Sequence, residues 1–185
     1  MNRKGFTLLE ILLVSGILVI LLAALMVAST EMRGIFYVSD VLATFQHEAR
    51  LAVNSMTIDI KRTSLSQVTI TQNYPAAGTD RLQFYLPADS DEDGEPDMSS
   101  GSLVWDPNVV TIEGEVVGTE MRLIRTQDAD TEVLADNLKS ITFIDNNIDS
   151  SLYMDEMNFI LELEKTSGTG KTLRVVFTSV VNMRN

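Results

Sequence analysis

The chain has 185 residues, of which 26 are Asp or Glu and 14 are Lys or Arg, so its formal net charge at pH 7 is −12. This length fits one ordinary domain. The acidity excludes nucleic acid as a direct partner, because affinity for phosphate backbones comes mainly from clustered Lys and Arg. The sequence has one histidine and no cysteine, which excludes disulfides, thiolate catalysis and metal sites built from cysteine or from several histidines.

The first predicted element is an apolar helix over residues 6–28, in which Glu10 is the only ionisable side chain. Such a helix is about 35 Å long, enough to cross a hydrocarbon core of about 30 Å. Arg3 and Lys4 precede it. By the positive-inside rule they place the N-terminus in the cytoplasm and the rest of the chain across the membrane.

Three interpretations of this segment compete: a secretory signal peptide, a permanent signal anchor, and a precursor that is processed ahead of its apolar segment. The apolar run is longer than the core of a signal peptide, and residues 26–28 form only a weak cleavage site. A carboxylate in the membrane is unfavourable by about 2.5–3.5 kcal/mol, so a plain anchor has no use for Glu10. The alternative is that Glu10 reaches the headgroups and interacts with the helix dipole.

The run Arg3-Lys4-Gly5-Phe6-Thr7-Leu8-Leu9-Glu10, with the apolar segment that follows, resembles the class III signal of type IV pilins and type II secretion pseudopilins. The resemblance implies that prepilin peptidase cuts between Gly5 and Phe6 and N-methylates Phe6. It also implies that Glu10 neutralises the N-terminal ammonium of a neighbouring subunit, which gives a physical reason for a carboxylate in lipid. Cleavage removes two basic residues and changes the net charge from −12 to −14.

The helix is predicted to continue to about residue 61, because an apolar stripe at helical period follows the membrane segment. The stripe consists of Val38, Leu42, Phe45, Ala49, Ala52 and Met56. Gly16 and Gly34 weaken the helix, each by about 1 kcal/mol relative to Ala, and two helices separated at Gly34 are the alternative. His47 lies off the stripe and is expected at the surface.

After Ser64 the apolar period changes from 3.6 to 2, which predicts β-strands with one buried face. Alternating runs lie at residues 68–70, 82–86, 157–163 and 173–181, and shorter candidates lie at residues 103–105, 109–112, 121–124 and 141–144. Residues 165–171 are predicted to join the last two alternating runs as a hairpin.

The predicted fold class is α+β, with a long N-terminal helix packed on an antiparallel β-sheet head. It is the pilin-like arrangement that the resemblance implies. The predicted organisation is a leader peptide at residues 1–5, a transmembrane and assembly half of the helix at 6–28, an amphipathic half at 29–62, and a strand-rich exported head domain at 63–185.

A dense acidic loop follows the strand predicted at residues 82–86, and its carboxylates are spaced as in an EF-hand-type calcium loop. The matching positions are Asp89, Asp91, Asp93, Gly94, Glu95 and Asp97. The similarity is to isolated DxDxDGxxD calcium loops, because Ser100 stands where an EF-hand needs a bidentate glutamate. A solvated acidic turn is the alternative. We expect Ca²⁺ at this loop and no other cofactor.

A softer resemblance extends beyond the N-terminus. Residues 48–62, 133–143 and 180–185 look similar to minor pilins of the W type and J-type pseudopilins. The lack of cysteine departs from major pilins that close a loop with a disulfide, which favours a minor component. The resemblance implies prepilin peptidase, other pilin or pseudopilin subunits and inner-membrane lipid as partners. It implies the bacterial inner membrane as the location, followed by a pilus or pseudopilus.

No catalytic motif is present, so we expect a structural subunit and not an enzyme. The alternative is a membrane-anchored calcium-binding interaction module that does not assemble into a filament. The Gly5–Phe6 junction together with Glu10 discriminates between the two, because an ordinary anchored protein would need neither.

Overall fold

The computed structural model describes residues 7–91, 93, 95–166 and 170–184, except for the side chains of residues 34 and 35. The chain divides into two compact units, Met1–Ala43 and Thr44–Asn185. We call the second of these the head unit.

Helix α1 spans Leu8–Arg62 and continues from one unit into the other. It is a single helix, so the alternative of two helices separated at Gly34 is not adopted. Its last turn contains Lys61 and Arg62, whose charges interact favourably with the negative end of the helix dipole. A short 3₁₀ helix, Leu65–Gln67, leads from the end of α1 to the first strand.

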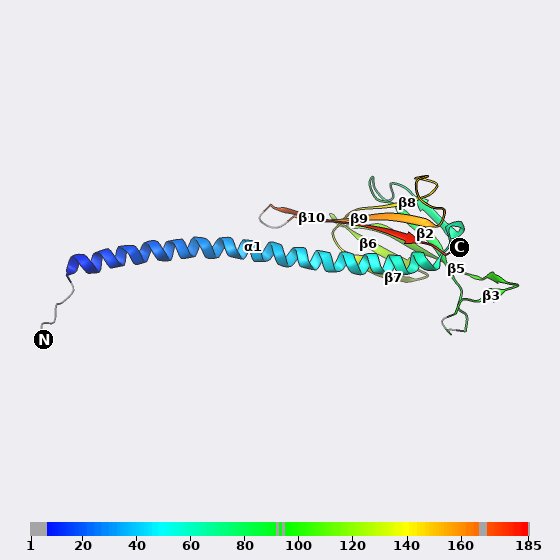
Figure 1. The fold of residues 1–185 in the computed structure, drawn as a ribbon, viewed down its shortest axis with the longest axis horizontal. Helices are drawn as coiled ribbons and strands as arrows, with labels where there is room; N and C mark the ends of the chain where they lie inside the picture. The colour runs from blue at the N-terminus through cyan, green and yellow to red at the C-terminus, as the bar shows by residue number, and fades with distance from the viewer. Residues whose placement is uncertain (1–6, 92, 94, 167–169, 185) are drawn as a thin grey trace. The chain divides into compact units, whose positions relative to one another are not determined.

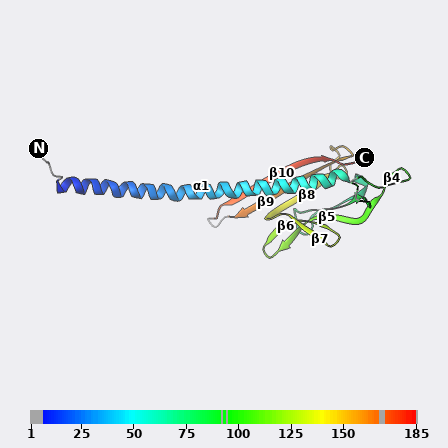
Figure 2. The ribbon, with the colours of Figure 1, turned by 90° about the horizontal axis from the view of Figure 1, so that it is seen from below.

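The part of α1 in the head unit packs through one apolar stripe. Phe45, Ala49, Ala52 and Met56 are buried there, as their helical spacing predicts, and Ile60 extends the stripe by one turn. His47 is exposed, which confirms its predicted place at the surface. In Figures 1 and 2 this part of α1 lies alongside the strands of the head unit.

The larger sheet has five antiparallel strands in the order β1-β2-β5-β6-β7. Their bounds are Val68–Thr71, Arg81–Pro87, Trp105–Val117, Glu120–Gln127 and Asp130–Ala135. Buried and half-buried side chains alternate along β2 and along the middle of β5, so one face of this sheet contributes to the core.

A second sheet has three antiparallel strands in the order β10-β9-β8, with bounds Thr172–Asn182, Glu156–Thr166 and Leu138–Asp145. Consecutive strands β9 and β10 pair from Thr166 opposite Thr172 onward, which confirms the predicted hairpin. Residues 167–169 of its turn lie outside the described residues. Strands β3, Met98–Ser99, and β4, Ser102–Leu103, form a small separate hairpin.

Asp80 joins the two larger sheets from a buried position. Its carboxylate accepts hydrogen bonds from the backbone N–H groups of Asn73 at 3.0 Å and Phe143 at 3.1 Å. Its own backbone N–H donates to the carbonyl of Ile141 at 2.8 Å. The rings of Phe143 and Phe159 pack with centroids 6.2 Å apart in the core beside this link.

The predicted α+β class is confirmed: a long N-terminal helix is followed by antiparallel sheets, and its stripe packs within the head unit. Strand β7 was not predicted, because its first residues, Asp130 to Glu132, are polar and exposed. The candidate strand at residues 103–105 is divided between β4 and the start of β5.

Candidate functional site

The predicted cleavage and methylation positions, Gly5 and Phe6, lie outside the described residues. The structure begins with Thr7, which caps helix α1. The backbone N–H of Glu10 donates to the Thr7 carbonyl at 3.0 Å and lies 3.3 Å from Thr7 Oγ1. Thr7 and Glu10 stand at the two ends of a Thr-x-x-Glu capping pattern, a helix-start signal that the sequence analysis missed.

Glu10 lies in the first turn of α1 and is exposed. Ile11, Val14 and Leu18 line the helix surface beside it. Among the described residues, the carboxylate has no hydrogen-bond or ion-pair partner. A charged group in this apolar setting is stabilised by a cationic partner.

The segment after Glu10 is apolar around its whole circumference. The large apolar side chains from Leu8 to Val27 are exposed, and α1 is long and apolar enough to cross a membrane. A helix with apolar residues on every face is stable only when lipid or protein surrounds it. The first part of α1 is therefore suited to membrane anchoring.

The acidic loop brings three of the predicted calcium ligands together. One carboxylate oxygen from each of Asp89, Asp91 and Asp93 lies within 4.8 Å of the other two. The backbone N–H of Asp97 donates to the Ala88 carbonyl at 2.8 Å, which closes the base of the loop. Three hard oxygen donors at this separation fit one Ca²⁺ ion, which needs six to eight ligands in total.

The other two predicted ligands are placed differently. The carboxylate of Asp97 accepts hydrogen bonds from the backbone N–H and the hydroxyl of Ser90. The backbone N–H of Glu95 donates to Asp93 Oδ1 at 2.7 Å. Both residues are therefore tied to the loop, and the structure does not place their carboxylates with the three aspartates.

Two arginines that the sequence analysis did not single out lie close to the loop. Arg62, at the end of α1, and Arg184, near the end of the chain, line a hollow of about 550 Å³ together with Asp89 and Glu95. The backbone N–H of Arg184 donates to the Thr63 carbonyl at 2.8 Å. This bond holds Arg184 beside the loop. No local sequence pattern could indicate that a cation lies there, because Arg184 is far from the loop in the sequence.

Glu48 is the acidic residue of α1 with the most perturbed environment. Its Oε2 atom is buried and has no hydrogen-bond partner among the described residues. Burial raises the pKa of Glu48 above its ordinary value, and Asp136 raises it further, whereas Lys165 and His47 lower it. The protonated form of this carboxyl is therefore favoured by the fold.

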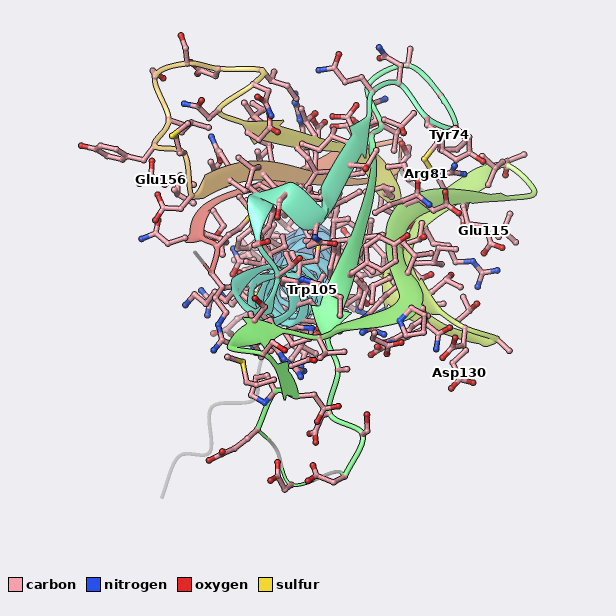
Figure 3. All side chains as sticks on the ribbon, turned by 90° about the vertical axis from the view of Figure 1, so that its right-hand side faces the viewer. Tyr74, Arg81, Trp105, Glu115, Asp130 and Glu156 are labelled. Atoms are coloured by element: carbon pink, nitrogen blue, oxygen red, sulfur yellow. The ribbon has the colours of Figure 1, made fainter. Side chains whose placement is uncertain are left out.

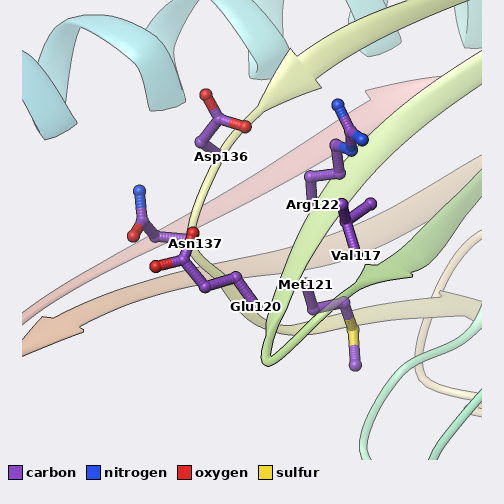
Figure 4. A pocket seen from close by; sticks show the side chains of 6 residues that line it. All are labelled: Val117, Glu120, Met121, Arg122, Asp136 and Asn137. Carbon is purple, nitrogen blue, oxygen red and sulfur yellow. The ribbon is translucent and has the colours of Figure 1, made fainter.

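The hollow shown in Figure 4 lies where the β5–β6 turn meets the connection between β7 and β8. It measures about 160 Å³, and its polar lining residues are Glu120, Arg122, Asp136 and Asn137. Arg122 is paired with Glu115 at 3.0 Å. These lining residues include no serine, threonine, cysteine, lysine or histidine, so the hollow offers no hydroxyl, thiol or amine nucleophile.

Comparison with known protein families gives a match for the N-terminal segment. Residues 1–26 match the family described as the prokaryotic N-terminal methylation motif. The chain carries that motif. The match covers the apolar start of α1 and includes Gly5, Phe6 and Glu10, so the resemblance to a pilin-type N-terminus is confirmed.

A solved structure, a type IV-like pilin from Thermus thermophilus, is similar with a TM-score of 0.41 and 10% sequence identity. The similarity covers 75% of this chain and 96% of that chain. No curated protein matches the chain.

Proposed function

We propose that this chain is a minor pilin or pseudopilin, a structural subunit of a type IV pilus or a type II secretion pseudopilus. The observation that carries the proposal is the methylation motif over residues 1–26, which includes most of an apolar helical segment whose large side chains are exposed. Prepilin peptidase cuts between Gly5 and Phe6 and methylates Phe6. This chemistry is carried out on the chain by the peptidase, and the role of the chain itself is structural.

In this proposal the subunit waits in the bacterial inner membrane with its N-terminus in the cytoplasm and its exported part on the other side. The charges before the apolar segment support this orientation. On assembly, the exposed apolar faces of α1 leave lipid and pack against neighbouring subunits, where close side-chain packing is the driving term. Glu10 pairs with the methylated N-terminal ammonium of a neighbour, which neutralises both charges.

Two features favour a minor subunit. The chain has no cysteine, so it lacks the disulfide that closes a loop in many major pilins. Its segments 48–62, 133–143 and 180–185 resemble minor pilins of the W type and J-type pseudopilins.

We further propose that the acidic loop binds Ca²⁺ through Asp89, Asp91 and Asp93, whose carboxylate oxygens lie within 4.8 Å of one another. Glu95 and Asp97 complete the site directly or through water after the loop rearranges. Calcium neutralises the repulsion among five acidic side chains in residues 91–97 and orders the loop. The same geometry supports the second candidate function, an anchored calcium-binding module that does not assemble.

The test of assembly is Glu10→Gln in the full-length chain, with Glu31→Gln as the matched control. Glu31 is an exposed acid on the same helix, beyond the apolar segment. We expect Glu10→Gln to insert normally into membranes but to fall at least about tenfold in the sheared filament fraction, since one partner of a desolvated charge pair is lost. Normal incorporation of Glu10→Gln would favour the headgroup role of Glu10 and the anchored module.

A further inference from the structure

The loop between β8 and β9, residues 146–155, exposes large apolar side chains. Tyr153 is 75% exposed and Met154 is 78% exposed, more than any other large apolar residue described in the head unit, and Ile148 is 45% exposed. In Figure 3, Glu156, which follows this loop, lies at the periphery of the head unit, on the side away from Asp130. Tyr153 and Met154 are neighbours in the chain, and contiguous exposed apolar surface marks interaction sites more often than isolated apolar residues do.

The first half of this loop is held in one conformation by Asp145, which is buried at the end of β8. Its carboxylate accepts hydrogen bonds from the backbone N–H groups of Asn147 at 3.1 Å and Ile148 at 3.0 Å. Its carbonyl accepts a hydrogen bond from the backbone N–H of Asp149 at 2.9 Å. These bonds fix the backbone that carries Ile148.

The second half is fixed in the same way. The backbone N–H of Tyr153 donates to Glu156 Oε2, and the N–H of Glu156 donates back to the Tyr153 carbonyl, both at 3.1 Å. The backbone N–H of Met183 donates to the Asp155 carbonyl and ties the loop to the end of the chain. Because the exposed side chains stand on an ordered backbone, little conformational entropy is lost when a partner covers them.

Within the loop and the adjoining parts of β8 and β9, the charged side chains are all acidic. Asp149 and Glu156 flank the exposed residues, and no Lys or Arg occurs from residue 140 to residue 164. Hydrogen bonds from the backbone and side chain of Ser151 lower the pKa of Asp149, so this carboxyl stays ionised in mildly acidic conditions.

The negative charge of the loop distinguishes between the possible binding partners of its apolar side chains. Anionic lipid and nucleic acid are repelled by it. A second copy of the chain carries a net charge of −12 and offers no overall complementarity. A protein surface with Lys and Arg around an apolar cleft complements both properties of the loop, because tyrosine and methionine are effective anchors within charged rims.

We propose that the β8–β9 loop is a docking site for a protein partner with a positively charged contact surface, and that Tyr153 and Met154 are the anchors that this surface receives. The proposal concerns the head unit and does not depend on filament assembly.

The experiment uses the full-length chain in native membranes, with a photoreactive phenylalanine analogue at position 153. The matched control carries the same analogue at Tyr85, a less exposed tyrosine on β2. We expect position 153 to give a protein adduct that position 85 does not give, mapped to a partner segment rich in Lys and Arg. Asp149→Asn together with Glu156→Gln keeps hydrogen-bond acceptors in place and removes two charges, so the adduct yield should fall about three- to tenfold.

A second variant, Tyr153→Ser with Met154→Ser, should abolish co-isolation of the mapped partner without changing the melting temperature, since both side chains are exposed. The proposal is overturned if position 153 gives no more adduct than position 85. It is also overturned if the adduct maps to a second copy of this chain or to a neutral or acidic segment, or if the charge-removing variant leaves the yield unchanged.

Discussion

Asp59 on α1 and Arg125 on β6 form an ion pair with a distance of 2.6 Å between Oδ2 and Nε, although they lie 66 residues apart in the chain. Their side chains are only 11% and 18% exposed. The guanidinium of Arg125 also donates to Gln127 Oε1 at 2.9 Å. This pair ties the last turns of the helix to the five-stranded sheet through groups that are largely removed from water.

We expect Asp59→Asn to lower the free energy of unfolding by about 3 kcal/mol, because it leaves the Arg125 charge buried without its counter-ion. Glu164→Gln is the control, since the Lys139–Glu164 pair is more exposed, at 55% and 30%, and its loss should cost less than about 1 kcal/mol. Urea unfolding of the detergent-solubilised chain measures both. Equal decreases in the free energy of unfolding of the two variants would show that the Asp59–Arg125 pair contributes no more to stability than an exposed ion pair.

The raised pKa of Glu48 predicts that the stability of the fold depends on pH. The folded state raises the pKa of this carboxyl above its ordinary value of 4.5, first through burial and then through Asp136. The stability that it contributes is therefore present below pH 4.5 and is lost as the pH rises through the folded-state pKa. We expect Glu48→Gln to be more stable than the parent chain at pH 7 and equally stable at pH 4.

Glu132→Gln controls for the loss of one negative charge from an acidic chain, because Glu132 is exposed on β7. Unfolding temperatures measured between pH 4 and pH 8 compare the variants. A gain for Glu48→Gln that is no larger than the gain for Glu132→Gln, or that does not depend on pH, would contradict the prediction.

Gly114 is a buried position on β5 that has no space for a side chain. A Cβ atom there would lie 2.9 Å from Met121 Sδ, 3.0 Å from Thr79 Cγ2 and 3.2 Å from Leu138 Cδ2. We expect Gly114→Ala to lower the free energy of unfolding by about 1–3 kcal/mol through overpacking. Val116→Ala, an exposed change on the same strand, should have an effect within about 0.5 kcal/mol. Denaturant unfolding that finds the two variants equally stable would contradict this packing.

Calcium binding predicts a heat of binding and a thermal shift. We expect titration calorimetry on the full chain to give a Kd near or below 10⁻³ M, the range of extracellular calcium modules. At a calcium concentration ten times the Kd, binding should stabilise the fold by about 1.4 kcal/mol.

Asp91→Ala should abolish both the heat and the thermal shift. Asp130→Ala, which removes an exposed aspartate at the start of β7, should retain both. The absence of millimolar binding in the parent chain, together with an unchanged melting temperature for Asp91→Ala in calcium, would show that the loop is only a solvated turn.

The sequence allowed the helix and most of the strands to be predicted where apolar residues repeat at a regular period. The helical stripe from Phe45 to Met56 and the alternation along β9 are examples. The β3–β4 hairpin has no such pattern, because it is formed by a turn in which Ser100 and Gly101 have positive φ angles of 54° and 83°. Strand β5 extends past Ile112 to Val117 because it pairs with β6, which local periodicity does not reveal.

For the candidate sites, short-range spacing was informative and long-range placement was not. The spacing of Asp89, Asp91 and Asp93 predicted their proximity, because all three belong to one loop. Arg184 lies at the far end of the sequence, and its place beside this loop depends on the path of β10. The exposure of Tyr153 likewise depends on the tertiary fold. The start of helix α1 after Thr7, in contrast, could have been predicted from the Thr-x-x-Glu pattern that Thr7 forms with Glu10.

The central claim is that the N-terminus is processed as the motif over residues 1–26 indicates, and mass spectrometry of the mature protein tests it most directly. The protein is isolated from membranes of a host that contains prepilin peptidase, and a host without the peptidase is the control. We predict an N-terminal peptide that begins at Phe6 and is heavier by one methyl group, and an uncleaved chain in the control. An intact Met1 in the presence of the peptidase would contradict the account.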